Sequence, residues 1–146
     1  MEIQELNTLS EENIKELTGL MAELTDSIAV TPEMLEAAAG DPSTHLFAAI
    51  EDGRIIGTAT LCITHSPTGR KGGIEDVVVS SEFRGRHLGR MLMEHIIDYA
   101  RQEYAPIELH LTSRPSREKA NLLYQAMGFR RHETNVYKYQ VQQSDI

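Results

Sequence analysis

A turn rich in arginine and glycine carries the clearest chemical signal in this sequence. Residues 80–90 read Ser-Ser-Glu-Phe-Arg-Gly-Arg-His-Leu-Gly-Arg and lie between a β-branched segment and an amphipathic one. A strand, a tight turn and a helix start in succession point free backbone N–H groups outward, and the helix dipole adds partial positive charge there. Arg84, Arg86 and Arg90 bring three guanidinium groups to the same place. Because guanidinium and backbone N–H groups together bind phosphate well, the turn predicts a phosphate-bearing ligand.

The turn does not match the common nucleotide-binding patterns. It lacks the Gly-Lys-Ser/Thr ending of a P-loop, and the spacing of Gly85 and Gly89 differs from the dinucleotide-binding Gly-x-Gly-x-x-Gly. ATP and NAD are therefore weak candidates for the ligand.

The size and charge of the chain restrict the classes of function. The 146 residues, 40% of them apolar and 25% charged, predict one globular domain over residues 1–146. The net charge is −8, and it is uneven: residues 1–53 hold twelve acidic side chains against Lys15 alone, whereas residues 54–146 carry a net charge of +3. We expect most of the acidic side chains to lie on solvated helix faces. Such a protein is a poor candidate for nucleic-acid binding, which needs a broad cationic surface.

Location and metal content are predicted from what the sequence lacks. It has no apolar run near the ~20 residues that cross a bilayer, and its first residues do not resemble a signal peptide, so a cytoplasmic protein without membrane contact is expected. Cys62 is the only cysteine and lies in an apolar segment, which favours an inert thiol. The six histidines show no metal-ligand spacing, so no metal is expected.

The hydrophobic periodicity predicts an α/β protein with a central mixed sheet flanked by helices. The expected order is βααβββαβαββ. Two capped helices fill much of the first half, and a hairpin follows around Glu51–Arg54. A polar loop over residues 66–73 leads into Ile74–Val79, which we expect to be the middle strand of the sheet. After a long helix come a strand near residues 107–112, a helix from about Ser116, and two short strands near Phe129 and over Asn135–Val141.

Two short motifs resemble those of the GNAT superfamily of N-acetyltransferases. The run Arg84–Gly89 resembles the Arg/Gln-x-x-Gly-x-Gly/Ala motif that binds acetyl-CoA, and Ala120–Phe129 resembles the Ala-x-x-Leu-Tyr-x-x-x-Gly-Phe signature. The expected element order also matches, so the resemblance covers nearly the whole chain. Residues 74–79, Ile-Glu-Asp-Val-Val-Val, are similar to the glucosamine-6-phosphate N-acetyltransferase branch.

The sequence departs from the family pattern at two positions. His87 stands where the family usually has the middle glycine of the acetyl-CoA motif, so the loop is expected to sit less closely on the pyrophosphate. Arg117 stands where many members have an asparagine that contacts CoA, and the sequence leaves open whether Asn121 compensates.

The resemblance implies acetyl transfer from acetyl-CoA to a primary amine by direct attack through a tetrahedral intermediate. It implies that Tyr124 is the acid for the CoA thiolate and that backbone N–H groups near Val77–Val79 bind the pantetheine. The full set of cofactor-binding residues that it implies is Val77, Val78, Val79, Arg84, Gly85, Arg86, His87, Leu88, Gly89, Arg90, Asn121 and Tyr124.

The base that accepts the proton of the amine is less well determined. A carboxylate in a partly buried strand has a raised pKa that suits this role, and Glu75 is our choice. Glu75 and Asp76 are expected to point to opposite faces of the strand. Asp76, His110 on the next strand and a water molecule are the other candidates.

The acceptor remains open between two small-molecule amines of opposite charge. The acidic first half would attract a polyamine or another cationic amine, whereas the similarity over residues 74–79 suggests an amino sugar phosphate, for which Arg70, Lys71 or Arg114 could supply a cation. A catalytically silent acyl-CoA-binding or sensor module of the same fold is the alternative to an enzyme. A homodimer is compatible with the sequence but not fixed by it.

Overall fold

The computed structural model describes residues 1–144, which form two compact units divided after Thr112. The first unit holds β1 (Glu2–Glu5), α1 (Glu11–Leu24), α2 (Pro32–Gly40), β2 (Thr44–Glu51), β3 (Arg54–Ser66), β4 (Gly69–Val79), the 3₁₀ turn η1 (Ser81–Phe83), α3 (Leu88–Glu103) and β5 (Glu108–His110). The second unit holds α4 (Glu118–Ala126). One domain over residues 1–146 stays a prediction.

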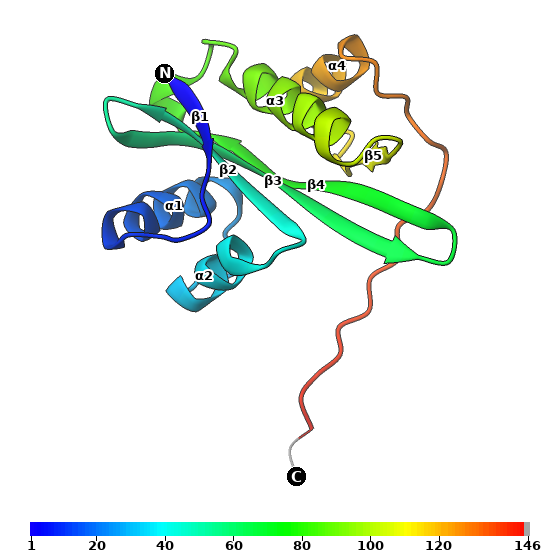
Figure 1. Cartoon of the computed structure of the whole chain (residues 1–146), viewed down its shortest axis with the longest axis horizontal. Coiled ribbons are helices and arrows are strands. Elements are labelled where there is room, and N and C mark those ends of the chain that lie inside the picture. The colour runs from blue at the N-terminus through cyan, green and yellow to red at the C-terminus, as the bar shows by residue number, and fades with distance from the viewer. Residues whose placement is uncertain (145–146) are drawn as a thin grey trace. The chain divides into compact units, whose positions relative to one another are not determined.

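The first unit is built on a mixed sheet with the strand order β1-β2-β3-β4-β5. The pairs from β1 to β4 are antiparallel, and β5 runs parallel to β4. Helices α1 and α2 lie on one face of this sheet and α3 lies on the other (Figure 1). The expected mixed α/β architecture is confirmed.

Local signals explain where the first two helices begin. The Ser10 hydroxyl accepts a hydrogen bond from the N–H of Asn13, and the Asn13 side chain accepts one from the N–H of Ser10, which completes a capping box. Thr31 caps α2 in the same way by accepting from the N–H of Met34, and Pro32 occupies the first helical position, where no N–H is needed. Both starts lie where the sequence predicts them.

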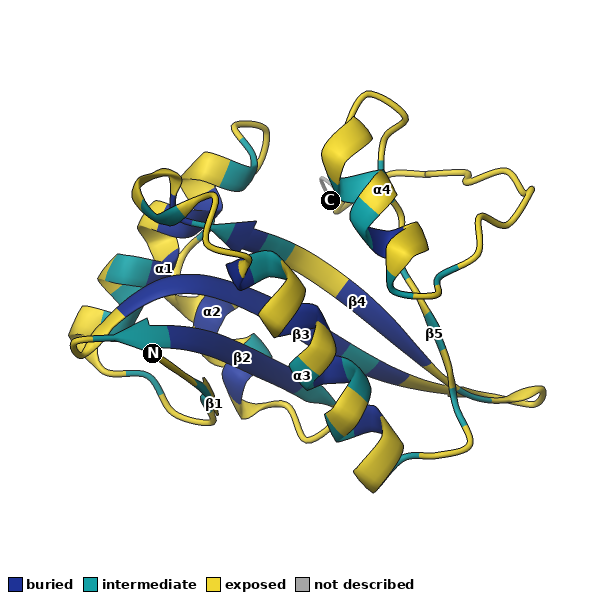
Figure 2. Cartoon of the chain, turned by 90° about the horizontal axis from the view of Figure 1, so that it is seen from above, coloured by how far each residue is buried: buried dark blue, intermediate teal, exposed yellow. Residues whose placement is uncertain are grey.

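Each face of the sheet has its own apolar layer. Against α1 and α2, the buried side chains include Leu17, Leu20, Leu46 and Val78. On the other face, α3 buries Leu92, Met93 and Ile96, all with no exposed surface. Figure 2 shows β2 and β3 buried along most of their length, whereas β4 has an exposed stretch between buried ones.

A buried polar cluster fixes the C-terminal end of α3 to the sheet. His45 Nδ1 lies 2.7 Å from Glu5 Oε2, and His45 Nε2 lies 2.6 Å from the Tyr104 hydroxyl. Arg70 Nη2 donates to the Tyr104 carbonyl at 2.5 Å. Burial raises the pKa of Tyr99 to about 12. The Tyr99 hydroxyl, 3.2 Å from His45 Nδ1, therefore stays protonated in neutral solution.

The expected position of the middle strand is wrong. The central strand is β3, and β4 lies beside the short edge strand β5. The expected loop over residues 66–73 is also mostly wrong, because β4 begins at Gly69 after a tight turn. Residues of low strand propensity are held there by pairing with β3, as in Thr64 opposite Lys71.

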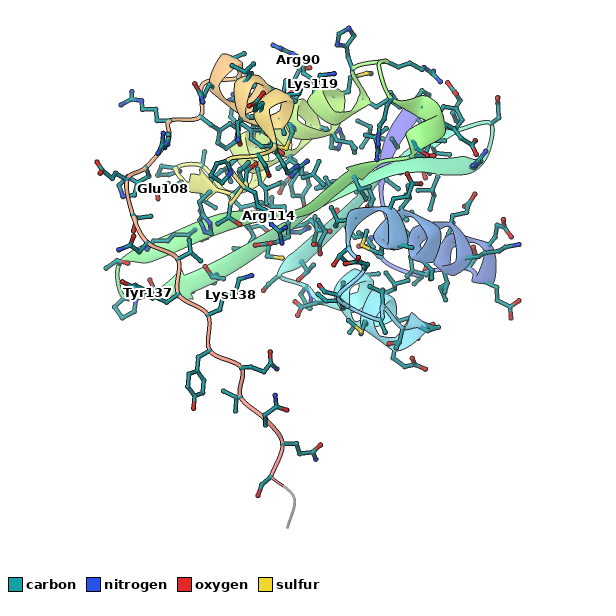
Figure 3. All side chains as sticks on the ribbon, turned by 180° about the vertical axis from the view of Figure 1, so that it is seen from behind. Arg90, Glu108, Arg114, Lys119, Tyr137 and Lys138 are labelled. Atoms are coloured by element: carbon teal, nitrogen blue, oxygen red, sulfur yellow. The ribbon has the colours of Figure 1, made fainter. Side chains whose placement is uncertain are left out.

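The two strands expected at the C-terminus are absent among residues 127–144. No strand follows α4 there, and the chain is extended and exposed as far as Ser144. Tyr137 and Lys138, labelled in Figure 3, lie on this segment, and Tyr137 and Tyr139 are 88% and 90% exposed. A strand needs a partner ladder as well as a suitable sequence, and local sequence does not supply that ladder.

Within the part of the chain that the structure describes, no helix has the length and apolar character needed to cross a membrane.

The apolar contact between α3 and the sheet predicts a stability difference between two adjacent residues. Leu92 is fully buried and Met91 is 39% exposed on the same helix. We expect Leu92→Ala to lower the free energy of unfolding by about 2–5 kcal/mol, because the truncation leaves a cavity. Met91→Ala should change it by about 0.5 kcal/mol or less. Urea denaturation of both variants measures the difference, and equal losses would contradict the packing described here.

Candidate active site

The C-terminal half of β4 has one edge without a partner strand. β5 pairs only with Lys71, Gly72 and Gly73, so among residues 1–144 no strand covers the outer edge of β4 from Ile74 to Val79. Backbone N–H and C=O groups on that edge are available to a ligand in extended conformation. The edge includes Val77, Val78 and Val79, the residues that the sequence resemblance assigns to pantetheine.

A β-bulge lies at the start of this free edge. Thr60 pairs with Glu75 and Thr58 pairs with Val78, so β4 has one residue more than β3 between these two pairs. Asp76, in the bulge, has a φ of 51°, in the left-handed region. The bulge interrupts the strict alternation of faces expected for Glu75 and Asp76.

The turn between β4 and α3 presents free N–H groups, as predicted. The N–H of Met91 donates to the His87 carbonyl at 3.0 Å and makes the first helical bond. The preceding N–H groups of Leu88, Gly89 and Arg90 are the unpaired donors of the helix start, and residues 1–144 provide no acceptor for them.

His87 takes the backbone conformation that normally favours glycine. Its φ is 60° and its ψ is 22°, and its side chain makes no capping bond. Gly85, two residues earlier, also has a positive φ, of 84°. The turn thus holds a left-handed step at His87, and histidine is one of the residues that tolerate this conformation better than most.

The three arginines of the turn are each paired with a carboxylate. Arg84 Nη2 lies 3.6 Å from Glu23 Oε1 of α1. Arg90, at the N-terminal end of α3 (Figure 3), donates from Nε to Glu94 Oε1 at 2.8 Å. Arg86 donates through two nitrogens to Glu51 at the end of β2. Glu23 and Glu51 come from the acidic first half, whose side chains were expected mostly on solvated helix faces, and the charge contrast between the two halves was the signal for these two partners.

Phe83 and the β2–β3 hairpin also hold the turn. The guanidinium carbons of Arg54 and Arg86 each lie 5.5 Å from the centre of the Phe83 ring. Arg54 Nη1 lies 3.3 Å from Glu82 Oε2. The Ser81 N–H donates to Glu23 Oε1 at 2.9 Å. The turn is therefore fixed by side chains from both the hairpin and α1.

Two of the candidate bases lie beside the same glycine. A Cβ placed on Gly73 would lie 3.2 Å from His110 Cε1 and 3.6 Å from Glu75 Oε1. Glu75 and Asp76 are exposed, which contradicts the expectation of a partly buried carboxylate at this point of β4. Gly73 is buried, and the two side chains already fill the position that its own side chain would take, which brings the carboxylate and the imidazole close together.

Cys62 lies on the same face of the sheet, since it pairs directly with Gly73. Burial raises the pKa of its thiol, and the charge of Glu75 raises that pKa further. The thiol is therefore protonated in neutral solution, in agreement with the expectation that it is not a nucleophile.

Of the cations considered for an acidic acceptor, Arg70 is already engaged. Its guanidinium donates to the Tyr104 carbonyl and lies 5.3 Å from the centre of the Tyr104 ring. Lys71 is exposed, and it alternates with Gly73 and Glu75 along β4, which places the three on one face. Lys71 is opposite Glu108 of β5, a residue labelled in Figure 3.

In the second unit, Tyr124 is buried and only 8% exposed. Its ring packs edge-on against Phe129 with 6.1 Å between centroids. Asn121 Nδ2 donates to the Arg114 carbonyl at 3.0 Å, and Arg117 is the N-cap residue of α4. The Asn121 amide lies on the same helix as Tyr124 and is used locally, because it binds the segment just before that helix.

A sequence comparison decides the family. The sequence profile described as Acetyltransferase (GNAT) family matches residues 9–129. The chain belongs to the GNAT acetyltransferase family. A glucosamine 6-phosphate N-acetyltransferase from Trypanosoma brucei brucei is 30% identical over 142 residues, which are 90% of this chain and 92% of that protein. Another from Arabidopsis thaliana is 33% identical over 94 residues, which are 56% of this chain and 62% of that protein.

A structural comparison agrees with this GNAT assignment at the level of the fold. A putative acetyltransferase from Agrobacterium tumefaciens superimposes with a TM-score of 0.79 at 24% identity, over 98% of this chain and all of that one. The GNAT resemblance seen in the two motifs is thus confirmed, and the family implies acetyl transfer. The roles of individual residues in this GNAT protein stay predictions. Among residues 1–144, no group of three or more His, Cys, Asp and Glu could hold a metal ion.

The effect of the Glu75 charge on the pKa of the Cys62 thiol can be tested by alkylation. Because its pKa is raised, the thiol should react with iodoacetamide at pH 8 more slowly than free cysteine does. Glu75→Gln removes one cause of the raised pKa, so the pKa should fall and alkylation should become about two- to threefold faster. The control is Glu11→Gln, on exposed helix α1, which should leave the rate unchanged. An unchanged rate in Glu75→Gln would mean that the two side chains do not interact.

Proposed function

We propose that this protein is an acetyl-CoA-dependent N-acetyltransferase whose acceptor is the primary amine of an amino sugar phosphate. The observation that carries the proposal is the similarity to glucosamine 6-phosphate N-acetyltransferase, which spans 90% of this chain and 92% of that relative. The free edge of β4, the turn 84–90 and the groups around Gly73 belong to the first unit and suit the donor and the acceptor, whereas Tyr124, the proposed acid, belongs to the second unit.

The donor side of the proposed site uses the free edge and the turn. The unpaired edge from Ile74 to Val79 suits the amide groups of pantetheine, and the free N–H groups of Leu88, Gly89 and Arg90 suit the pyrophosphate. Arg84 and Arg86 add positive charge in the same turn. Since His87 keeps the left-handed step of the turn, it does not remove these donors.

The acceptor side of the proposed site lies over Gly73. The Glu75 carboxylate and the His110 imidazole lie beside this glycine, and either could take a proton from an amine bound next to them. Lys71, on the same face, is the cation that could attract a sugar phosphate. This arrangement favours an amino sugar phosphate over a polyamine, because a polyamine gains nothing from Lys71.

The proposed reaction forms an N–C bond and breaks the C–S bond of the thioester. Glu75 accepts the proton that the amine loses, and Tyr124 gives a proton to the departing thiolate. His110 is the second candidate for the base, because it lies beside the same glycine. A backbone N–H of the free β4 edge would polarise the thioester carbonyl.

The alternative is a catalytically silent module that binds acyl-CoA without turnover. Arg117, at the start of α4, is the feature that favours it, because the asparagine expected there by the family pattern is missing. The module would bind CoA but would release no free thiol when amines are supplied.

The donor and the acid are tested together. We expect acetyl-CoA and CoA, but not ATP, to raise the unfolding temperature, because a ligand that binds only the native state stabilises it. With an accepted amine, the free thiol of CoA should be released, and Tyr124→Phe should slow this release about 10- to 1,000-fold. Tyr99→Phe is the matched control, since Tyr99 lies in the polar cluster at His45. Binding without thiol release over a panel of amines would favour the silent module, and an unchanged rate in Tyr124→Phe would remove the acid role.

The acceptor and the base are tested by steady-state kinetics. We expect glucosamine 6-phosphate to be acetylated with a kcat/KM at least about tenfold above that of spermidine, since the phosphate contributes a charge-assisted contact. Glu75→Gln should lower kcat about 10²- to 10⁴-fold and remove the acidic limb of the pH profile. His110→Asn should leave that limb in place. The reverse pattern would move the base to His110, and a preference for spermidine would contradict the amino sugar phosphate.

A further inference from the structure

The three arginines of the turn differ in how closely a carboxylate binds the nitrogen atoms of each guanidinium. The Arg84–Glu23 contact is long, at 3.6 Å, and Arg90 and Glu94 are neighbours on one helix. Arg86 alone is held at two nitrogens: Nη1 donates to Glu51 Oε2 at 2.9 Å and Nη2 donates to Glu51 Oε1 at 2.6 Å. A carboxylate from another element therefore fills the forked end of this guanidinium.

The fork that Glu51 occupies is also the one that a phosphate would use. Two parallel N–H donors match the two oxygens of a carboxylate and the two oxygens of a phosphate equally well. The Arg86 guanidinium is restrained from a second direction, because its carbon lies 5.5 Å from the centre of the Phe83 ring. A phosphate that binds at the turn would therefore have to displace Glu51 from an Arg86 guanidinium that is already oriented.

The pair is tight but open to solvent. The Arg86 side chain is 46% exposed and the Glu51 side chain is 25% exposed. The hydrogen bonds from Arg86 lower the pKa of the Glu51 carboxyl, so it stays ionised in neutral solution and protonation does not release Arg86. An exposed ion pair of this kind contributes little free energy, and a ligand that brings its own charge can replace it.

We propose that Glu51 is an internal competitor for the phosphate of the ligand at Arg86 and thereby sets the affinity for CoA. This inference rests on the proposed function, in which the turn 84–90 binds CoA. On binding, the Arg86 guanidinium exchanges the Glu51 carboxylate for a phosphate oxygen pair, and no covalent bond changes.

The test measures the dissociation constant of CoA for wild type, Glu51→Gln and Glu82→Gln by titration calorimetry. Glu82 is the matched control, because it is a carboxylate of the same turn region that pairs with Arg54 and not with Arg86. We expect Glu51→Gln to bind CoA about two- to fivefold more tightly, the range expected for loss of an exposed ion pair. Glu82→Gln should change the constant by less than about 1.5-fold.

A second set of variants shows that the effect passes through Arg86. In the background of Arg86→Gln, which should weaken CoA binding, Glu51→Gln should have no further effect, since the two changes share one interaction. Glu51→Asp keeps the charge but shortens the side chain, and its affinity should fall between those of wild type and Glu51→Gln. Unfolding temperatures without ligand confirm that each variant is folded.

The outcomes separate this inference from the proposed function. If wild type binds CoA and Glu51→Gln binds it equally or less tightly, Glu51 is not a competitor and the proposed function stands. Equal tightening by Glu82→Gln would also overturn the inference, because general charge would then explain the effect. If no variant binds CoA, including Glu51→Gln, the proposed function and this inference both fail.

Discussion

The early end of the β4–β5 pairing is the constraint on which the candidate site depends. β5 pairs with Lys71, Gly72 and Gly73 and then stops, so the rest of β4 carries polar backbone groups on one edge. Such groups must find partners, and a buried or half-buried edge without them costs free energy. The bulge at Asp76 and the exposed stretch of β4 lie at the beginning of the same edge. A ligand with its own amide groups satisfies the edge as a neighbouring strand would.

The turn that follows β4 adds a second group of free backbone donors, which suit an anion. Free N–H groups at the start of α3 and a left-handed step at His87 come directly after the free edge. Free backbone donors therefore occur in two stretches of this segment, first along the β4 edge from Ile74 to Val79 and then at Leu88, Gly89 and Arg90 of the helix start. An elongated ligand with amides at one end and phosphates at the other matches that order. Apolar packing positions these donors, because α3 packs on the sheet through the buried side chains of Leu92 and Ile96.

Much of this arrangement follows from local sequence, and the parts that do not are those set by pairing. Ser10, Thr31 and Pro32 define helix starts because a cap is a contact over three residues. The turn 84–90 is equally local. By contrast, pairing with β3 makes residues 69–73 part of a strand although their own strand propensity is low. The bulge at Asp76 also cannot be predicted from the hydrophobic pattern. The strand pattern over Asn135–Val141 shows the opposite case, because the alternation is present but residues 1–144 supply no partner for it.

The charge distribution gains a physical meaning only from the tertiary contacts. Read along the sequence, an acidic first half and a basic turn are separate features. In the fold, Glu23 and Glu51 from the first half lie against Arg84 and Arg86, so the site is close to charge balance before any ligand arrives. A turn with three unpaired arginines would hold any polyanion, whereas paired arginines admit only a ligand that replaces the carboxylates with better-placed oxygens. In the proposed function, Glu23 and Glu51 of the acidic half would therefore lower the affinity of the turn for anions in general and favour a ligand with well-placed oxygens.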